Sequence, residues 1–160
     1  MKILGIDPGI SIIGWGVIDT HAGSPGAIGY GCIRPAPGAL PDRLLVIHEK
    51  IGELTRLYKP DIVCVEELFF ATNAKTAFAV GQARGVILLS AALHQIPLVS
   101  YTPLVIKQAV CGDGKANKRQ VEKMVTLTLK LKTAPKPDDV ADALAIALTH
   151  AFMYKMKRFI

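Results

Sequence analysis

Five short apolar segments, separated by turn residues or helical stretches, constrain the fold of this 160-residue chain more than any other feature of its sequence. They predict strands over residues 2–6, 12–18, 30–34, 61–66 and 98–101. Short turns such as Asp7-Pro8-Gly9 join the first three, which predicts an antiparallel meander. Because helical segments separate the later strands, the sequence predicts a mixed α/β sheet in one domain over residues 1–160.

Helical spacing of apolar residues, together with capping signals, predicts the helices around this sheet. They are expected over residues 44–58, 73–95, from 103 onward, 117–131 and 137–154. Thr102 before Pro103 and Asn117 are expected N-caps. The helix over 73–95 is apolar nearly all round from Val86 onward, which leaves two interpretations open: a central core helix, or the interface of a homodimer.

The basic residues are concentrated in one segment. The chain carries a net charge of +6, and the segment from Lys107 to Lys136 contains eight basic and two acidic residues, so it accounts for the whole excess. Such a concentration is typical of a protein that binds phosphates, and a solvated helix face is the alternative. Since no aromatic residue interrupts the segment, phosphate contact is expected there rather than base stacking.

The composition excludes several classes of protein. With 51% apolar residues the chain is not disordered, and its longest apolar run, Val86–Leu93, is far shorter than the ~20 residues of a membrane span. The three cysteines, Cys32, Cys64 and Cys111, are too far apart for a zinc knuckle or a disulfide framework. A soluble, cytoplasmic protein without a membrane partner is therefore expected.

Carboxylates follow the expected apolar strands and begin the last helix. Asp7 ends the first strand and Glu66 the fourth, and if these strands are parallel neighbours both side chains lie at one edge of the sheet. Converging carboxylates repel one another unless a cation neutralises them, and all-oxygen ligands select Mg²⁺ or Mn²⁺. Two such ions, ~3.5–4 Å apart, suit hydrolysis of a phosphodiester.

Each acidic residue also has a purely structural interpretation. Asp7 could be a turn residue, and Glu67 points to the opposite face from Glu66 on a strand. Acidic residues in the first turn of a helix stabilise its dipole without any further function. Helical geometry leaves open whether Asp138 or Asp139 joins Asp142 at the site, because both pairs share a face.

Four motifs resemble the RuvC family of Holliday junction resolvases. They are Gly5-Ile6-Asp7-Pro8-Gly9; Glu66 with Phe69 and Asn73; Gly81-Gln82-Ala83-Arg84-Gly85; and the run that starts Asp139-Val140-Ala141-Asp142. The resemblance covers the chain from Met1 to about His150, in the family's order and spacing. It implies an RNase H-like fold, with a sheet of three antiparallel and then two parallel strands. It also implies a homodimeric endonuclease that makes paired, symmetric nicks in a four-way DNA junction.

The family's motifs imply a role for particular residues. Asp7, Glu66, Asp139 and Asp142 match its catalytic, metal-binding acids, and the motif favours Asp139 over Asp138. Lys107, Lys118 and Phe69 match positions at the DNA, the last against unpaired bases. The implied cofactor is Mg²⁺, two ions per subunit, for which Mn²⁺ can substitute. A RuvA–RuvB-type branch-migration complex is an implied partner.

Two other functions are compatible with the same strands and acidic residues. An actin-like ATPase also places an Asp and a Gly after its first strand, but it needs two such domains around a nucleotide. A non-catalytic nucleic-acid-binding module could use the same scaffold, although four carboxylates beside phosphates would then only repel. Nicking of a mobile four-way junction during a Mg²⁺ titration distinguishes these functions.

Overall fold

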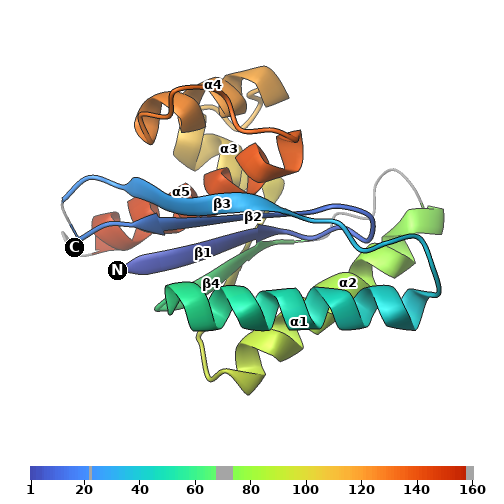
Figure 1. The fold of residues 1–160 in the computed structure, drawn as a ribbon. Helices are drawn as coiled ribbons and strands as arrows, with labels where there is room; N and C mark the ends of the chain where they lie inside the picture. Colours follow the sequence, from blue (N-terminus) through green and yellow to red (C-terminus); the bar gives the residue numbers. More distant parts are fainter. Residues whose placement is uncertain (22, 68–73, 158–160) are drawn as a thin grey trace.

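A computed structural model describes residues 1–21, 23–67 and 74–157 and contains one five-stranded sheet (Figure 1). The strand order is β3-β2-β1-β4-β5. The strands are β1 (Lys2–Asp7), β2 (Ile13–Asp19), β3 (Gly26–Ile33), β4 (Ile62–Glu66) and β5 (Leu98–Tyr101). The first three pair antiparallel, whereas β4 pairs parallel with both β1 and β5. The predicted arrangement of three antiparallel and two parallel strands is confirmed.

Helices cover both faces of this sheet (Figure 1). The helices are α1 (Leu40–Tyr58), α2 (Ala74–Leu93), α3 (Pro103–Cys111), α4 (Lys118–Thr128) and α5 (Asp138–Lys157). One core lies between the sheet and the pair α1 and α2, and includes Leu4 and Ile6 of β1. The other lies between the sheet and α5, with α3 and α4 beyond it, and includes Ile3. In the described residues, no helix is long and apolar enough to cross a membrane.

The predicted N-caps are confirmed, and the boundaries of several elements differ from the predicted ones. Thr102 accepts a hydrogen bond from the amide of Val105, and Asn117 forms a reciprocal capping box with Gln120. Strand β3 starts four residues before the expected position 30, because its glycines weaken the sequence signal for a strand. Helix α4 ends three residues before the expected position 131.

Helix α2 is buried on one side only, so the interpretation as a central core helix is wrong for a single chain. Ala83, Ile87 and Ala91 are fully buried in the core shared with α1. Phe78 and Leu89 instead remain 75% and 56% exposed. The apolar residues of α2 therefore lie in two places: those on one side fill the core, and those on the other cover the outer surface.

Glycines on β1 and β2 allow α5 to lie unusually close to the sheet. Gly5 and Gly16 face each other across the two strands, and Asp7 faces Gly14. A Cβ atom on Gly5 would overlap the carbonyl oxygen of Ala143, and one on Gly16 would lie 2.5 Å from Leu144 Cδ2. A side chain at Gly14 would overlap the carbonyl oxygen of Asp139. The backbone of α5 thus rests directly on the backbone of the two strands.

Replacing Gly5 with alanine is expected to destabilise the fold by about 3 kcal/mol, because the added methyl group must push α5 away from the sheet. Urea unfolding monitored by circular dichroism measures this change. Gly26→Ala is the matched control, since a Cβ atom there meets nothing within 4 Å. Equal stability of the two variants would contradict the close packing.

Candidate active site

The register of the sheet brings Asp7 and Glu66 together. Ile6 pairs with Val65 in the parallel ladder, so the next residues on β1 and β4 are neighbours at the carboxyl ends of the strands. Side chains alternate along a strand. Ile3 and Cys64 belong to the core beneath α5, so Asp7 and Glu66, at even spacing from them, point to that same face. Glu67 is exposed.

Helix α5 adds two more carboxylates at this edge. The carbonyl of Asp139 lies over Gly14, which is the strand partner of Asp7, and Asp142 follows almost one turn later. The negative charges of Glu66, Asp142 and Asp139 all act on the Asp7 carboxyl group. The structure therefore brings together the four acidic residues that the sequence singled out.

Burial and mutual repulsion make the ionised form of this cluster unfavourable. Burial, followed by the charges of Glu66, Asp142 and Asp139, raises the pKa of Asp7 well above its ordinary value. Burial and the charge of Asp142 also raise the pKa of Glu66. Burial raises the pKa of Asp142, although the ammonium group of Lys118 opposes this effect. The ionised forms of these three carboxyl groups are therefore disfavoured by burial first and by their neighbours' charges second.

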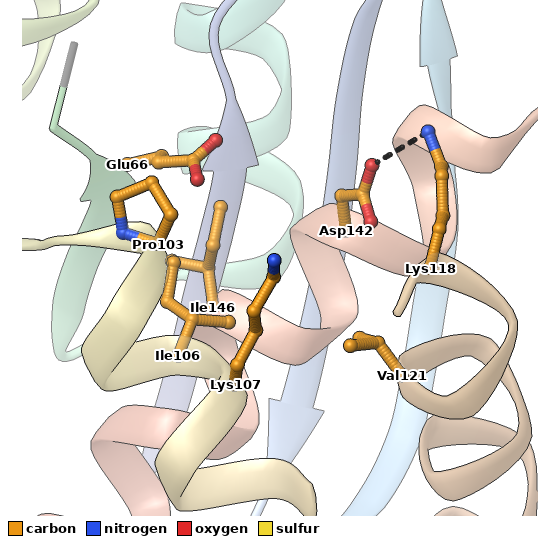
Figure 2. Close-up of a pocket in the computed structure, with 8 residues that line it drawn as sticks. All are labelled: Glu66, Pro103, Ile106, Lys107, Lys118, Val121, Asp142 and Ile146. Carbon is orange, nitrogen blue, oxygen red and sulfur yellow. Dashed lines mark ion pairs between the residues drawn. The ribbon is translucent and has the colours of Figure 1, made fainter. Parts of the chain in front are cut away.

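Two lysines face the cluster across a pocket of about 230 Å³ (Figure 2). Lys118 Nζ lies 3.2 Å from Asp142 Oδ2, and the Lys107 side chain points toward the space between Glu66 and Asp142. The pocket has an apolar floor formed by Pro103, Ile106, Val121 and Ile146. Lysines and carboxylates thus share one partly apolar recess, where charges interact more strongly than in water.

Asp138 and Asp139 differ in their surroundings, although Asp138 also lies 3.6 Å from the Lys118 ammonium group that pairs with Asp142. Asp138 is 48% exposed, and its Oδ1 lies 3.1 Å from the ammonium group of Lys136. That hydrogen bond and charge lower the pKa of Asp138, whereas it is Asp139 whose charge acts on Asp7. Phe69, predicted to contact DNA, lies outside the described residues.

Two arginines hold the backbone around the acidic residues. Arg84 of α2 donates from Nε to the carbonyl of Glu66 (3.3 Å) and from Nη2 to Ser100 Oγ (2.8 Å). Arg43 of α1 donates from Nη2 to the carbonyl of Ile10 (2.6 Å), in the turn after β1. Sequence reasoning gave neither residue a role. The signal available for Arg84 was its place in the motif Gly81-Gln82-Ala83-Arg84-Gly85.

In the described residues, no group of three or more His, Cys, Asp or Glu side chains is already arranged to hold a metal ion. The donor chemistry of the acidic cluster nevertheless fits a hard divalent cation, because carboxylate oxygens are its preferred ligands. The raised pKa values of Asp7 and Glu66 also fit a cation site, since a bound cation would favour the ionised forms of both groups.

Residues 3–150 match the family model described as crossover junction endodeoxyribonuclease RuvC. A protein of that name from Brevibacillus brevis is 53% identical over 152 residues, which cover 94% of this chain and 92% of the relative. Its counterpart from Moorella thermoacetica is 54% identical over 152 residues, which cover 94% of this chain and 91% of the relative.

Solved structures show the same fold. The structure of Thermus thermophilus RuvC superposes with a TM-score of 0.91 and 38% identity, covering 98% of this chain and 97% of that one. T. thermophilus RuvC in complex with a Holliday junction substrate gives a TM-score of 0.88 and 37% identity, covering 98% of this chain and 96% of that one.

Replacing Asp7 with asparagine is expected to stabilise the protein at pH 7 in buffer with EDTA. The raised pKa means that the folded state binds the Asp7 proton more tightly than the unfolded chain does. The free energy of unfolding therefore falls as pH rises from the ordinary carboxyl range through the raised pKa. Removing this charge should add about 0.5–2 kcal/mol, seen as a rise in Tm of several degrees.

Asp138→Asn is the control for this measurement, because the pKa of Asp138 is lowered by its hydrogen bond with Lys136 and no gain in stability is expected. An Asp7→Asn protein that is no more stable than the wild type at pH 7 would show that the cluster is not under electrostatic strain.

Proposed function

The chain belongs to the RuvC family of crossover junction endodeoxyribonucleases, and from this premise we propose that the acidic cluster between β1, β4 and α5 is its catalytic centre. The protein is a Holliday junction resolving endonuclease, which hydrolyses phosphodiester bonds of four-way DNA. The observation that carries the assignment of the centre is the convergence of Asp7, Glu66, Asp139 and Asp142 at one edge of the sheet.

The family is metal-dependent, and the four carboxylates are the groups that would hold the metal. We propose two Mg²⁺ ions per subunit, for which Mn²⁺ can substitute. The all-oxygen donor set and the raised pKa values of Asp7 and Glu66 support this choice. Bound there, the ions would supply a water of lowered pKa and stabilise the negative charge on the departing oxygen.

The lysines of the pocket have the chemistry needed to bind the scissile strand. Lys107 makes no ion pair in the described residues, so its ammonium group is available to a phosphate. Lys118 pairs with Asp142 and Asp138, and it would be released to a phosphate if a bound cation neutralised those carboxylates. Both contacts fix the position of the DNA without reading its sequence. Phe69 stays a prediction as the residue that contacts unpaired bases.

In the hydrolysis itself, the oxygen of a water molecule attacks the phosphorus and the bond from phosphorus to the 3′-oxygen breaks. The departing 3′-oxygen takes up a proton, so the products carry a 5′-phosphate and a 3′-hydroxyl group. The apolar residues Ile106 and Ile146 exclude water from one side of the pocket, which strengthens the attraction between the lysines and the phosphate.

The exposed side of α2 has the character of a homodimer interface. Phe78, Leu89 and Leu93 lie on one face of the helix and are 75%, 56% and 62% exposed. Gly85 lies among them and has open space above it, which permits a close approach of a second helix. A four-way junction has two equivalent strands to cut, and a two-fold dimer presents two equivalent catalytic centres to them.

The proposed function also includes a domain organisation, a cellular location and a partner. Residues 1–160 form a single nuclease domain, which is supported by the two cores that share one sheet. The three free cysteines are consistent with a cytoplasmic location. A RuvA–RuvB-type complex, which would move the branch point, is a proposed partner on the basis of family membership alone.

The variant Asp7→Asn is expected to lose at least about 1000-fold in the rate of junction cleavage, because metal-dependent stabilisation of the transition state amounts to several kcal/mol. Its binding to the junction should remain, since Asp7 contributes no attraction to phosphates. The rate is measured with a labelled mobile four-way junction during a Mg²⁺ titration, with a linear duplex as the substrate control. Undiminished cleavage by this variant would refute the assignment of the centre.

Leu89→Glu is expected to convert a dimer into monomers, because it buries a charge in the apolar contact between two α2 helices. Sedimentation at micromolar concentration measures the oligomeric state. The control is Leu57→Glu, which places the same charge at an exposed position of α1. A monomeric wild-type protein, or a dimer that survives Leu89→Glu, would show that α2 is not the interface.

A further inference from the structure

Arg34 follows β3 at the same edge of the sheet as the acidic cluster. Strand β2 is antiparallel to both β1 and β3, so the carboxyl ends of β1 and β3 lie on one side. Gly14 of β2 pairs with Asp7 on one flank and with Cys32 on the other. With strands about 4.8 Å apart, the backbone of Cys32 is about 10 Å from that of Asp7.

Arg34 follows the edge strand of the sheet, where it lines a pocket with Lys50 and Glu53 of α1, and its side chain turns back to Cys32. Ile33 belongs to the core beneath α1 and α2, whereas Cys32 packs against the core beneath α5. Arg34 donates a hydrogen bond from Nε to Cys32 Sγ at 3.3 Å, which places it with Cys32. This hydrogen bond is the main cause that raises the pKa of Arg34, and the charge of Asp139 raises it further.

The guanidinium group of Arg34 is available to a ligand. The residue is exposed, and in the described part of the chain it forms no ion pair with a carboxylate. Its one hydrogen bond uses Nε, which leaves the four N–H groups of the two Nη atoms free. Those groups match two oxygens of a phosphate, and the contact with Cys32 already restricts their orientation.

Arg34 also lies on a different flank of the cluster from Lys107. The Lys107 side chain points toward the space between Glu66 and Asp142, whereas Arg34 follows β3, on the other side of β1 from β4. Lys118 pairs with Asp142 and Asp138 at the start of α5. A DNA strand that passes over four carboxylates is repelled by them, and cations on one flank alone leave it free to pivot away. A cation on the second flank fixes the strand at two points.

We propose that Arg34 binds a backbone phosphate next to the scissile one, on the flank of the acidic cluster opposite Lys107. This inference rests on the proposed function, because it concerns the same DNA strand at the same centre. Arg34 is thereby a DNA-positioning residue that contacts the substrate backbone and takes no part in the proton transfers.

The test is the salt dependence of junction binding by the full chain, measured in EDTA so that no cleavage occurs. Arg34→Ala should weaken binding roughly tenfold at low salt, since it removes a charge-assisted hydrogen bond to phosphate. The slope of log K against log[salt] should become shallower by about 0.9, the contribution of one phosphate contact on duplex DNA. The loss should be the same for junctions of different sequence.

Two further variants make this result specific. Arg34→Lys keeps the charge, so it should retain the wild-type slope while losing part of the affinity that two-point hydrogen bonding provides. Arg56→Ala removes an exposed arginine of α1 beside His94, away from the acidic cluster, and should change neither quantity. The Tm of Arg34→Ala should equal that of the wild type.

Wild-type affinity and slope in Arg34→Ala would overturn the inference while leaving the proposed function intact. A weaker binding that accompanies a lowered Tm, or an equal effect of Arg56→Ala, would also overturn it. A wild-type protein that fails to bind or cut the junction would instead refute the proposed function, so the two failures are distinguishable.

Discussion

The close contact between α5 and the sheet is the constraint on which the rest of the structure depends. Only glycine at positions 5 and 14 leaves room for the helix backbone to lie directly on β1 and β2, and Gly16 leaves room for the Leu144 side chain. That approach places the start of α5 over the end of β1, where Asp7 is the strand partner of Gly14. The same glycines therefore determine both the packing of the core and the position of the carboxylates.

Bringing these carboxylates together makes their ionisation unfavourable. Burial and mutual repulsion raise the pKa values of Asp7, Glu66 and Asp142, and a positive charge nearby opposes this rise. Lys118 supplies part of this positive charge through its ion pair with Asp142. Functional sites commonly retain such unfavourable charge, because the ligand that relieves it is then bound more tightly.

Helix α2 connects the outer surface to this centre. Its buried side packs on α1 and the sheet, and its exposed side carries Phe78 and Leu89. Arg84, on the same helix, donates a hydrogen bond to the carbonyl of Glu66, so the helix that is proposed to pair with a second chain also holds the end of β4.

The sequence by itself determined the elements, the sheet class, the caps at Thr102 and Asn117, and the acids that terminate apolar strands, because turns, capping and periodicity are local. Helical periodicity left open the choice between Asp138 and Asp139, which the family motif made, and the role of α2. Only the tertiary structure showed the ion pair of Asp138 with Lys136 and the effect of the Asp139 charge on Asp7. The contacts of Arg43 and Arg84 with the backbone near the acidic residues likewise came from the tertiary structure, since hydrogen-bond partners distant in sequence leave no periodic signal in it.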